Sequence, residues 1–500
     1  MLKGALKILG GNIISYPFNL AKVFIIAKVL DPGTYGVFSL FTVILSYSLW
    51  CEFGILSGMD KIIPYLRGKS DYTELNNIRN AAFTWFIFVY LFLIIVLFFV
   101  TFIPGFSFSK EINVGLRLLS VVIFLSVVQN FFLTIARAEK RFGTIGMTNA
   151  VFAVSSVLLL LLFFKAPLDR LHATLISFIL AYAISLLFCM LRSEFNFKMN
   201  LSVSKLKKII HMGFPIVVIG ISFTIFTSID RWVIVKYLGK SQLGYYAFGM
   251  SIANFLFGLM AVFAYVSFPL VRERFAKESD LTKFNPYMHN TMLLMSYIIA
   301  FSSSILIATL PFVYKNIFYK YASGLESAYF LIIGIFFISM ATIPGNFIVA
   351  INKQKVIIFA QAIGIAVLLI ADYLVVKLTG SITGVSAVTA GTFFIYSVFV
   401  ISCSFKYVGD TYAKSFKLIL KLLLPFALGL LIVFLLRVVF NSLSAPELFV
   451  TLFKVVTLVF FYPLLFYLQN KDMGIFRKTK ILLGNNVQPV TENYTPSGLF

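Results

Sequence analysis

The sequence predicts an all-α integral membrane protein with about 14 transmembrane helices, built as two parallel six-helix repeats around a central cavity with two extra C-terminal helices. Three observations lead to this fold class. Of the 500 residues, 60% are hydrophobic and only 12% are charged. Apolar runs recur along the chain, and a short motif occurs twice, 208 residues apart. A soluble domain could not cover so much apolar surface with so few polar side chains.

The apolar runs divide into spans because a helix crosses the hydrocarbon layer in about 20 residues. Pro17 and Lys22 lie inside the first run, which is too long for a cleaved signal peptide, so we expect it to be the first span. Residues 485–500 lack periodicity and are expected to form a disordered tail. The predicted spans are 9–30, 36–57, 81–103, 114–135, 145–165, 171–191, 212–235, 244–268, 288–313, 327–349, 355–377, 380–403, 415–439 and 447–468.

The repeated motif indicates two structurally equivalent halves. Its first copy runs from Lys28 to Phe38 and its second from Lys236 to Tyr246, each at the end of a long apolar segment. Six spans separate the copies, and because this number is even, both copies face the same side and the halves are parallel repeats. The expected domains are an N-terminal half at 1–195, a C-terminal half at 196–408, two additional transmembrane helices at 409–470 and a cytoplasmic tail at 471–500.

The charge of the loops predicts the orientation. Most of the 42 Lys and Arg residues fall in segments that are cytoplasmic if the N-terminus is inside, so the positive-inside rule places both termini in the cytoplasm. The net charge of +23 is then largely topological, and we expect it to contact membrane lipids and no nucleic acid. Two amphipathic stretches, Lys205–Ile210 and Lys414–Lys421, suit helices on the inner membrane surface.

Two stretches resemble a known family. The run from Ser228 to Gly239, followed by Leu243 to Ala247, is similar to the seventh span of polysaccharide flippases, and Leu30 to Leu40 is similar to the segment after their first. These flippases belong to the multidrug, oligosaccharidyl-lipid and polysaccharide (MOP) flippase superfamily, which also holds multidrug and toxin extrusion exporters and the lipid II flippase.

The resemblance implies a flippase, not an enzyme, that moves an undecaprenyl-diphosphate-linked oligosaccharide from the cytoplasmic to the outer leaflet. It also implies ion-coupled alternating access, a place in the bacterial cytoplasmic (inner) membrane, and a role in making O-antigen of lipopolysaccharide, capsule or another surface polysaccharide. A polysaccharide polymerase and chain-length machinery are the protein partners it suggests. The glycan, the oligomeric state and the coupling ion are left open.

Such a cargo needs a wet, preferably cationic groove for its diphosphate and sugars. Polar residues form stripes on single helix faces of the first, fourth and seventh spans. The seventh-span stripe holds Thr224, Thr227, Ser228 and Arg231. The candidate cavity residues are Asn12, Asn19, Lys22, Lys28, Arg117, Asn130, Asp230 and Arg231. Two alternatives remain: Lys28 and Arg117 could snorkel to headgroups, and Asp230 could pair structurally with Arg231.

Two acids inside spans, Glu52 and Asp372, are candidates for ion coupling, because a buried carboxylate can take up and release a proton or hold Na+. Each could instead neutralise a basic neighbour. No cofactor or metal is expected. The Gly-Lys-Ser triplets at Gly68 and Gly239 have Ile63 and Ile234 where a phosphate-binding loop needs its first glycine, and the His and Cys residues are scattered.

Three rival functions were weighed. A membrane-embedded polysaccharide polymerase or ligase would be expected to carry a long outer loop, whereas the outer loops here are short. A multidrug exporter for cationic drugs would favour an acidic pocket, whereas the first-span stripe ends in Lys22. A lipid II flippase carries the same diphosphate and stays an open alternative.

Overall fold

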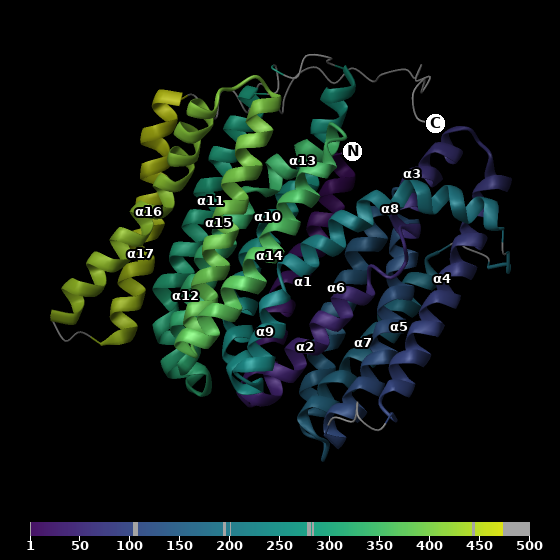
Figure 1. Ribbon diagram of the computed structural model, residues 1–500, viewed down its shortest axis with the longest axis horizontal. Helices are drawn as coiled ribbons and strands as arrows, with labels where there is room; N and C mark the ends of the chain where they lie inside the picture. Colours follow the sequence, from purple (N-terminus) through teal and green to yellow (C-terminus); the bar gives the residue numbers. More distant parts are fainter. Residues whose placement is uncertain are drawn as a thin grey trace.

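The computed structural model describes residues 2–103, 109–193, 197–200, 202–277, 282, 285–442 and 446–473. Within these ranges, the side chains of 2–13, 259–277, 287, 441–442 and 470–473 are not described. The predicted tail at 485–500 lies outside the described residues. Helices make up the described elements, and Figure 1 shows them packed side by side, with α16 and α17 at one edge of the molecule and α4 and α5 toward the other.

Among the described residues, seven helices belong to the first half and ten follow it. The first seven are α1 (Leu2–Val29), α2 (Pro32–Ser48), α3 (Ile55–Gly68), α4 (Tyr72–Val100), α5 (Lys110–Ala138), α6 (Phe142–Phe163) and α7 (Arg170–Leu191). The others are α8 (Val203–Phe226), α9 (Ile229–Tyr237), α10 (Lys240–Lys277), α11 (Asn285–Phe312), α12 (Leu325–Met340), α13 (Thr342–Ala350), α14 (Gln354–Thr379), α15 (Ile382–Tyr407), α16 (Tyr412–Ser442) and α17 (Glu447–Met473). Two short turns, η2 (Val313–Ile317) and η3 (Tyr319–Gly324), join α11 to α12.

The predicted fold class is confirmed, but three spans are broken. Among the described residues, 11 helical segments are long and apolar enough to cross a membrane, and α1, α2 and α10 supply the remaining predicted crossings. The predicted span 36–57 is interrupted at residues 49–54 and continues as α3, because Phe53 and Gly54 adopt positive φ angles of 55° and 95°. The span at 212–235 breaks between α8 and α9, and that at 327–349 breaks at Ala341.

The two copies of the repeated motif touch one another where α2 and α10 begin. A Cβ placed on Gly36 would lie 2.0 Å from the carbonyl oxygen of Lys240, and one on Gly244 would lie 1.7 Å from that of Pro32. Gly244 and Lys240 each lie 208 residues after Gly36 and Pro32, so the two close approaches are related by the repeat. The contact is backbone against backbone, and a side chain at either glycine would separate the helices.

Local sequence explains why these helices start where they do. Asp31 caps α2, because its Oδ2 accepts from the backbone N–H of Thr34 at 3.1 Å, and Pro32 occupies the first helical turn. In the second copy, Gly239 separates α9 from α10 with a φ of 87°, in the left-handed region that favours glycine. Both copies therefore end one helix and begin another within a few residues.

A second pair of contacts between the halves follows the same offset. The Tyr16 hydroxyl on α1 donates to the carbonyl oxygen of Gly258 on α10 at 2.7 Å. On the other side, Trp50 Nε1, just after α2, donates to Thr224 Oγ1 on α8 at 2.9 Å. Each partner in the first bond lies 208 residues from a partner in the second. The inter-half contacts thus repeat as parallel duplication requires, while the domain boundaries at 195, 408 and 470 stay predictions.

Glycines also bring α3 against α8. A Cβ on Gly213 would lie 1.8 Å from the carbonyl oxygen of Gly54, and one on Gly58 would lie 2.3 Å from that of Ile209. The broken second span therefore packs its continuation directly on the helix that opens the second half.

A buried ion network fastens the ends of α4 and α5. Arg79 on α4 pairs with Glu139 after α5, and both side chains are only 8% exposed. Arg141 Nε adds a second contact to Glu139 at 2.9 Å. Breaking a buried pair leaves an uncompensated charge and is far more destabilising than breaking an exposed one.

Arg79→Ala is expected to destabilise the protein by about 3 kcal/mol, at the lower end for a broken buried pair, since Glu139 would keep its charge in a buried site with Arg141 as its remaining partner. The apparent melting temperature of purified protein measures this. Arg137→Ala is the matched control, because Arg137 pairs with Asp60 at 2.9 Å but is 46% exposed, and it should cost about 1 kcal/mol or less. Equal shifts for the two variants would contradict this assignment.

The contact between the motif copies predicts a disulfide. A Cβ on Gly33 would lie 3.3 Å from Ser241 Oγ, so Gly33→Cys with Ser241→Cys should close an S–S bond under mild oxidation. Peptide mass analysis detects the bond, and each single variant serves as its control. Two thiols that stay reduced in the double variant would show that the halves do not meet here.

Candidate functional site

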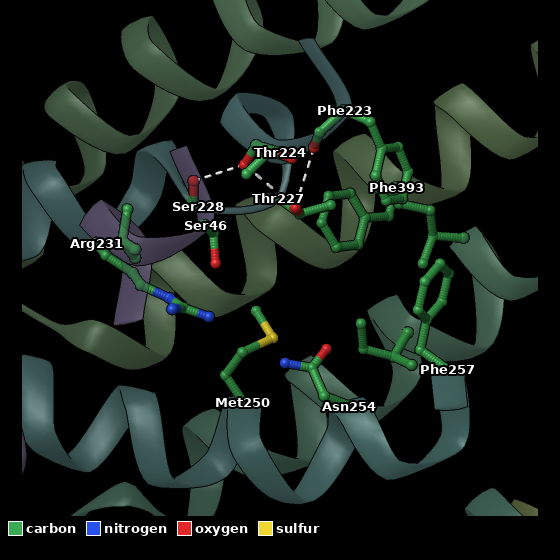
Figure 2. A pocket seen from close by; sticks show the side chains of 13 residues that line it. Ser46, Phe223, Thr224, Thr227, Ser228, Arg231, Met250, Asn254, Phe257 and Phe393 are labelled. Atoms are coloured by element: carbon green, nitrogen blue, oxygen red, sulfur yellow. Dashed lines mark hydrogen bonds between the residues drawn. The ribbon is translucent and has the colours of Figure 1, made fainter. Parts of the chain in front are cut away.

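A cavity of about 180 Å³ lies where helices of both halves meet. Figure 2 shows Ser46 of α2 facing it from the first half, and Asn254 and Met250 of α10 facing it from the opposite wall. The seventh-span stripe of Thr224, Thr227, Ser228 and Arg231 also faces it, on both sides of the break between α8 and α9. Its lining residues are Val43, Ser46, Phe223, Thr224, Thr227, Ser228, Arg231, Met250, Asn254, Phe257, Ile335, Ile338 and Phe393.

Arg231 is the cation of this cavity. Its side chain reaches from the first turn of α9 into the space opposite Met250 and Asn254 (Figure 2). Its Nε is buried and has no hydrogen-bond partner among the described residues. A buried donor left unpaired is costly, so a guest that brings acceptor oxygens, above all anionic ones, would gain from binding here.

The hydroxyls beside Arg231 hold the helix break. Ser228 Oγ donates to the carbonyl oxygen of Thr224 at 2.6 Å, and Thr227 Oγ1 donates to that of Phe223 at 3.0 Å. Tyr47 of α2 is hydrogen bonded to Ser228 Oγ at 2.8 Å. Freed backbone groups at a membrane helix break are satisfied in this way only inside protein or beside a cavity, so the break and the polar cavity depend on one another.

Asp230 lies next to Arg231 but points elsewhere, into the second half. It is 1% exposed, and its carboxylate accepts from the Tyr246 hydroxyl of α10 and from the backbone N–H of Arg231, the latter at 2.7 Å. Thr389 Oγ1 of α15 lies 3.5 Å away. Its hydrogen-bond contact with Arg231 thus runs through the backbone of Arg231.

Asp372 of α14 completes an acidic site with Asp230. It is 0% exposed, both of its carboxylate oxygens have no hydrogen-bond partner among the described residues, and it lies within electrostatic range of Asp230. Two carboxylates cannot both stay ionised and unpaired in an apolar interior. A proton or a cation such as Na+ would relieve this, and Thr389 and Tyr246 offer further oxygens.

Glu52, the other coupling candidate, has a structural partner. It is 3% exposed, and its Oε2 accepts from the backbone N–H of Leu56 at 2.7 Å, which caps the start of α3. It lines a second cavity, of about 230 Å³, within the first half, together with Asp60, Asn130 and Arg137. Asn130 therefore belongs to this second cavity and does not line the one that holds Arg231.

The structure does not bring Lys22 and Arg231 into one cavity. Lys22 Nζ donates to Asn19 Oδ1 at 2.9 Å and lies 4.9 Å from the ring centre of Phe152 on α6, so it points into the first half. A cation over an aromatic face is a stable arrangement without any ligand. Asn12 has a side chain outside the described residues, so its role stays a prediction.

The remaining predicted cations lie at the periphery. Arg117 Nε donates to Thr101 Oγ1 at 3.0 Å, and its guanidinium lies 4.0 Å from the ring centre of Phe102. Lys28 is exposed near the start of α2.

Sequence reasoning missed Asn254, Tyr246 and Thr389. Asn254 is an amide within an apolar span, a costly placement that signals function, so it could have been found. Tyr246 and Thr389 are common residues in such spans and become notable only because the fold brings them to Asp230.

Comparisons with known proteins agree with this architecture. The sequence profile of the polysaccharide biosynthesis protein family matches residues 1–275, more than half of the chain. No curated protein gives a significant match.

Among solved structures, the lipid II flippase MurJ in an inward closed conformation has a TM-score of 0.71 at 15% identity, covering 93% of this chain and 99% of that one. An inward-facing multidrug resistance MATE family transporter has a TM-score of 0.66 at 13% identity, covering 83% of this chain and 99% of that one. A MOP superfamily transporter from Pyrococcus furiosus has a TM-score of 0.59 at 12% identity, with coverages of 81% and 95%.

At such identities the structural likeness establishes the fold, and the sequence profile establishes the family. Two parallel halves meeting at a polar cavity, this fold and the match over residues 1–275 together lead to one conclusion: the chain belongs to the polysaccharide biosynthesis protein family and has the fold of the MOP superfamily transporters.

Proposed function

We propose that this protein is a flippase that moves an undecaprenyl-diphosphate-linked oligosaccharide from the cytoplasmic to the outer leaflet for surface polysaccharide biosynthesis. The observation that carries the proposal is Arg231, whose buried Nε lacks a hydrogen-bond partner within the part of the chain that the structure describes and whose side chain faces a cavity with hydroxyls and an amide. Arg binds diphosphate oxygens through a fixed fork of N–H donors. Thr224, Thr227 and Asn254 can hydrogen bond sugar hydroxyls nearby.

The closed outer end supports alternating access. Gly36 and Gly244 hold α2 against α10 by backbone contact, and parting the two helices there would also break the hydrogen bond from the Tyr35 hydroxyl on α2 to Ser251 Oγ on α10. The cavity, of about 180 Å³, would accept the diphosphate while this contact is closed, and the head group would be released outward when the halves part and the space widens. The lipid tail stays in the bilayer throughout, because it needs no polar path.

Asp230 and Asp372 are the proposed coupling site. Asp230 and Arg231 are adjacent in the first turn of α9, and one faces the acidic site while the other faces the cavity. Binding of H+ or Na+ at Asp230 and Asp372 can therefore shift α9 and, with it, the Arg231 side chain in the cavity. Glu52, the other candidate for ion coupling, accepts a hydrogen bond at the start of α3, which favours a structural role for it.

The rival cargoes differ in charge. None of the 13 cavity-lining residues is acidic, and one is Arg231, which disfavours a cationic drug. A lipid II flippase remains the second candidate, because its cargo carries the same diphosphate that Arg231 suits. A membrane-embedded polymerase or ligase would be expected to act from long outer loops, and the described connections between helices are short.

The proposed setting is the bacterial inner membrane, with both termini cytoplasmic. O-antigen or capsule assembly, with a polymerase and chain-length machinery as partners, belongs to the same proposal. Deleting the gene tests it: surface glycan should disappear, and lipid-linked oligosaccharide should accumulate inside the cell. Normal glycan with new drug sensitivity would assign the protein to the exporters instead.

Arg231→Ala should fail to restore surface glycan in the deletion strain, with transport reduced roughly 10- to 100-fold, since a charged hydrogen bond contributes about 1.5–3 kcal/mol. Lys236→Ala is the matched control, because Lys236 is an exposed cation on the same helix α9, and it should restore glycan fully. Membrane levels of both variants must match wild type. Full activity of Arg231→Ala would overturn the assignment.

Asp372→Asn should keep the fold and remove the dependence of transport on the ion gradient, because the amide is neutral and can neither release a proton nor neutralise Na+. The reconstituted protein, assayed with and without H+ and Na+ gradients, measures this. Glu52→Gln is the contrast: it weakens the cap of α3, so it should lower stability and leave gradient dependence intact. The reverse pattern would move coupling to the first half.

A further inference from the structure

An apolar groove lies between α4 and the first half of α8, away from the cavity that holds Arg231. Its volume is about 640 Å³. Figure 1 shows α8 running obliquely from α3 and α4 toward α9, so one helix borders the groove with residues 203–215 and the cavity with residues 223–226. The groove is lined by Trp85, Val203, Leu206, Lys207, Ile210, His211, Phe214 and Pro215.

The chemistry of the groove is apolar with two basic groups. Lys207 and His211 lie four residues apart on one face of α8, about 6 Å between their Cβ atoms, so both can approach one anion. Trp85 adds an indole Nε1 that is buried and has no hydrogen-bond partner among the described residues. An apolar groove with the donors Lys207 and His211 on one helix face suits a lipid whose acyl chain lies along the groove and whose anionic head group binds these donors.

Polar contacts build the groove before any ligand arrives. Lys205 Nζ on α8 pairs with Glu74 Oε2 on α4 at 2.6 Å. The segment that leads into α8 lies along α4, where the backbone N–H of Lys198 donates to Asn80 Oδ1 at 3.0 Å and that of Asn200 donates to Thr84 Oγ1 at 3.1 Å. On its other face α8 packs on α3 through Gly213. The trough is therefore a fixed feature of the fold.

We infer that this groove binds an anionic glycerophospholipid of the inner leaflet, with its phosphate between Lys207 and His211 and an acyl chain along Val203, Ile210 and Phe214. Charge complementarity selects an anionic head group. None of the eight lining residues carries a hydroxyl, amide or carboxylate side chain, so the groove has little to offer an oligosaccharide. The lipid braces α8 against α4, and α8 leads directly to the break beside Arg231.

Tryptophan quenching tests the inference, because bromine on an acyl chain quenches only nearby indoles. The full-length protein is placed in phosphatidylcholine nanodiscs with equal small fractions of brominated phosphatidylglycerol or brominated phosphatidylcholine. Trp85→Phe isolates the signal of Trp85 from those of Trp50 and Trp232. Wild type should show stronger quenching of Trp85 by the phosphatidylglycerol. Equal quenching by the two lipids would overturn the inference.

The variants separate a built site from general attraction to charge. Lys207→Gln with His211→Gln should reduce the preference for phosphatidylglycerol about fivefold or more, as expected for removing a basic group near anionic head groups. Lys208→Gln is the matched control, because Lys208 is exposed on the same helix and does not line the groove. An equal loss in Lys208→Gln would contradict a specific site.

A competition experiment tests whether the groove binds the polyprenyl lipid of the proposed cargo instead. Unlabelled phosphatidylglycerol should relieve the quenching, and unlabelled polyprenyl phosphate should do so no better at equal amounts. Relief by polyprenyl phosphate at much lower amounts would assign the groove to the carrier lipid and overturn the choice of a glycerophospholipid. Because binding alone is measured, the outcome is independent of whether the protein transports oligosaccharide.

Discussion

The backbone contact between α2 and α10 at Gly36 and Gly244 is the constraint on which the rest of the structure depends. It joins the two halves at the ends of their repeated motifs, and no larger residue fits at either position without moving a helix. From this point α2 and α10 descend along the cavity, and their side chains Ser46 and Asn254 face the stripe on α8 and α9. A fold joined by backbone contact at one end is suited to parting there.

The break between α8 and α9 converts that scaffold into a site. The break at Thr227 and Ser228, held by hydroxyl contacts to the backbone, lets Arg231 face the cavity while Asp230 faces Tyr246 and Thr389. One turn of helix therefore links a cationic cavity to an acidic site, as the proposed ion coupling would require.

Much of this could be predicted from the sequence. The lengths of the apolar runs predict the membrane crossings, and the repeated motif predicts the parallel halves. The spacing of Thr224, Thr227, Ser228 and Arg231 predicts one helix face, and this face lines the cavity. The breaks were missed because positive φ at Phe53 and hydroxyl bonding at Ser228 leave no periodic signal. Lys22 was placed in the shared cavity because its stripe is polar, yet Phe152 and Asn19 satisfy it within the first half. Periodicity identifies a face but not which neighbour it meets.

The central claim is that the cavity carries an anionic, lipid-linked saccharide across the membrane. Purified protein in liposomes with a polyprenyl-diphosphate-linked oligosaccharide in the inner leaflet tests it most directly, with outward movement followed by an added sugar-cleaving enzyme. The account predicts much faster exposure of the oligosaccharide than in protein-free liposomes, and no transport of a cationic dye. Transport of the dye without movement of the oligosaccharide would contradict it.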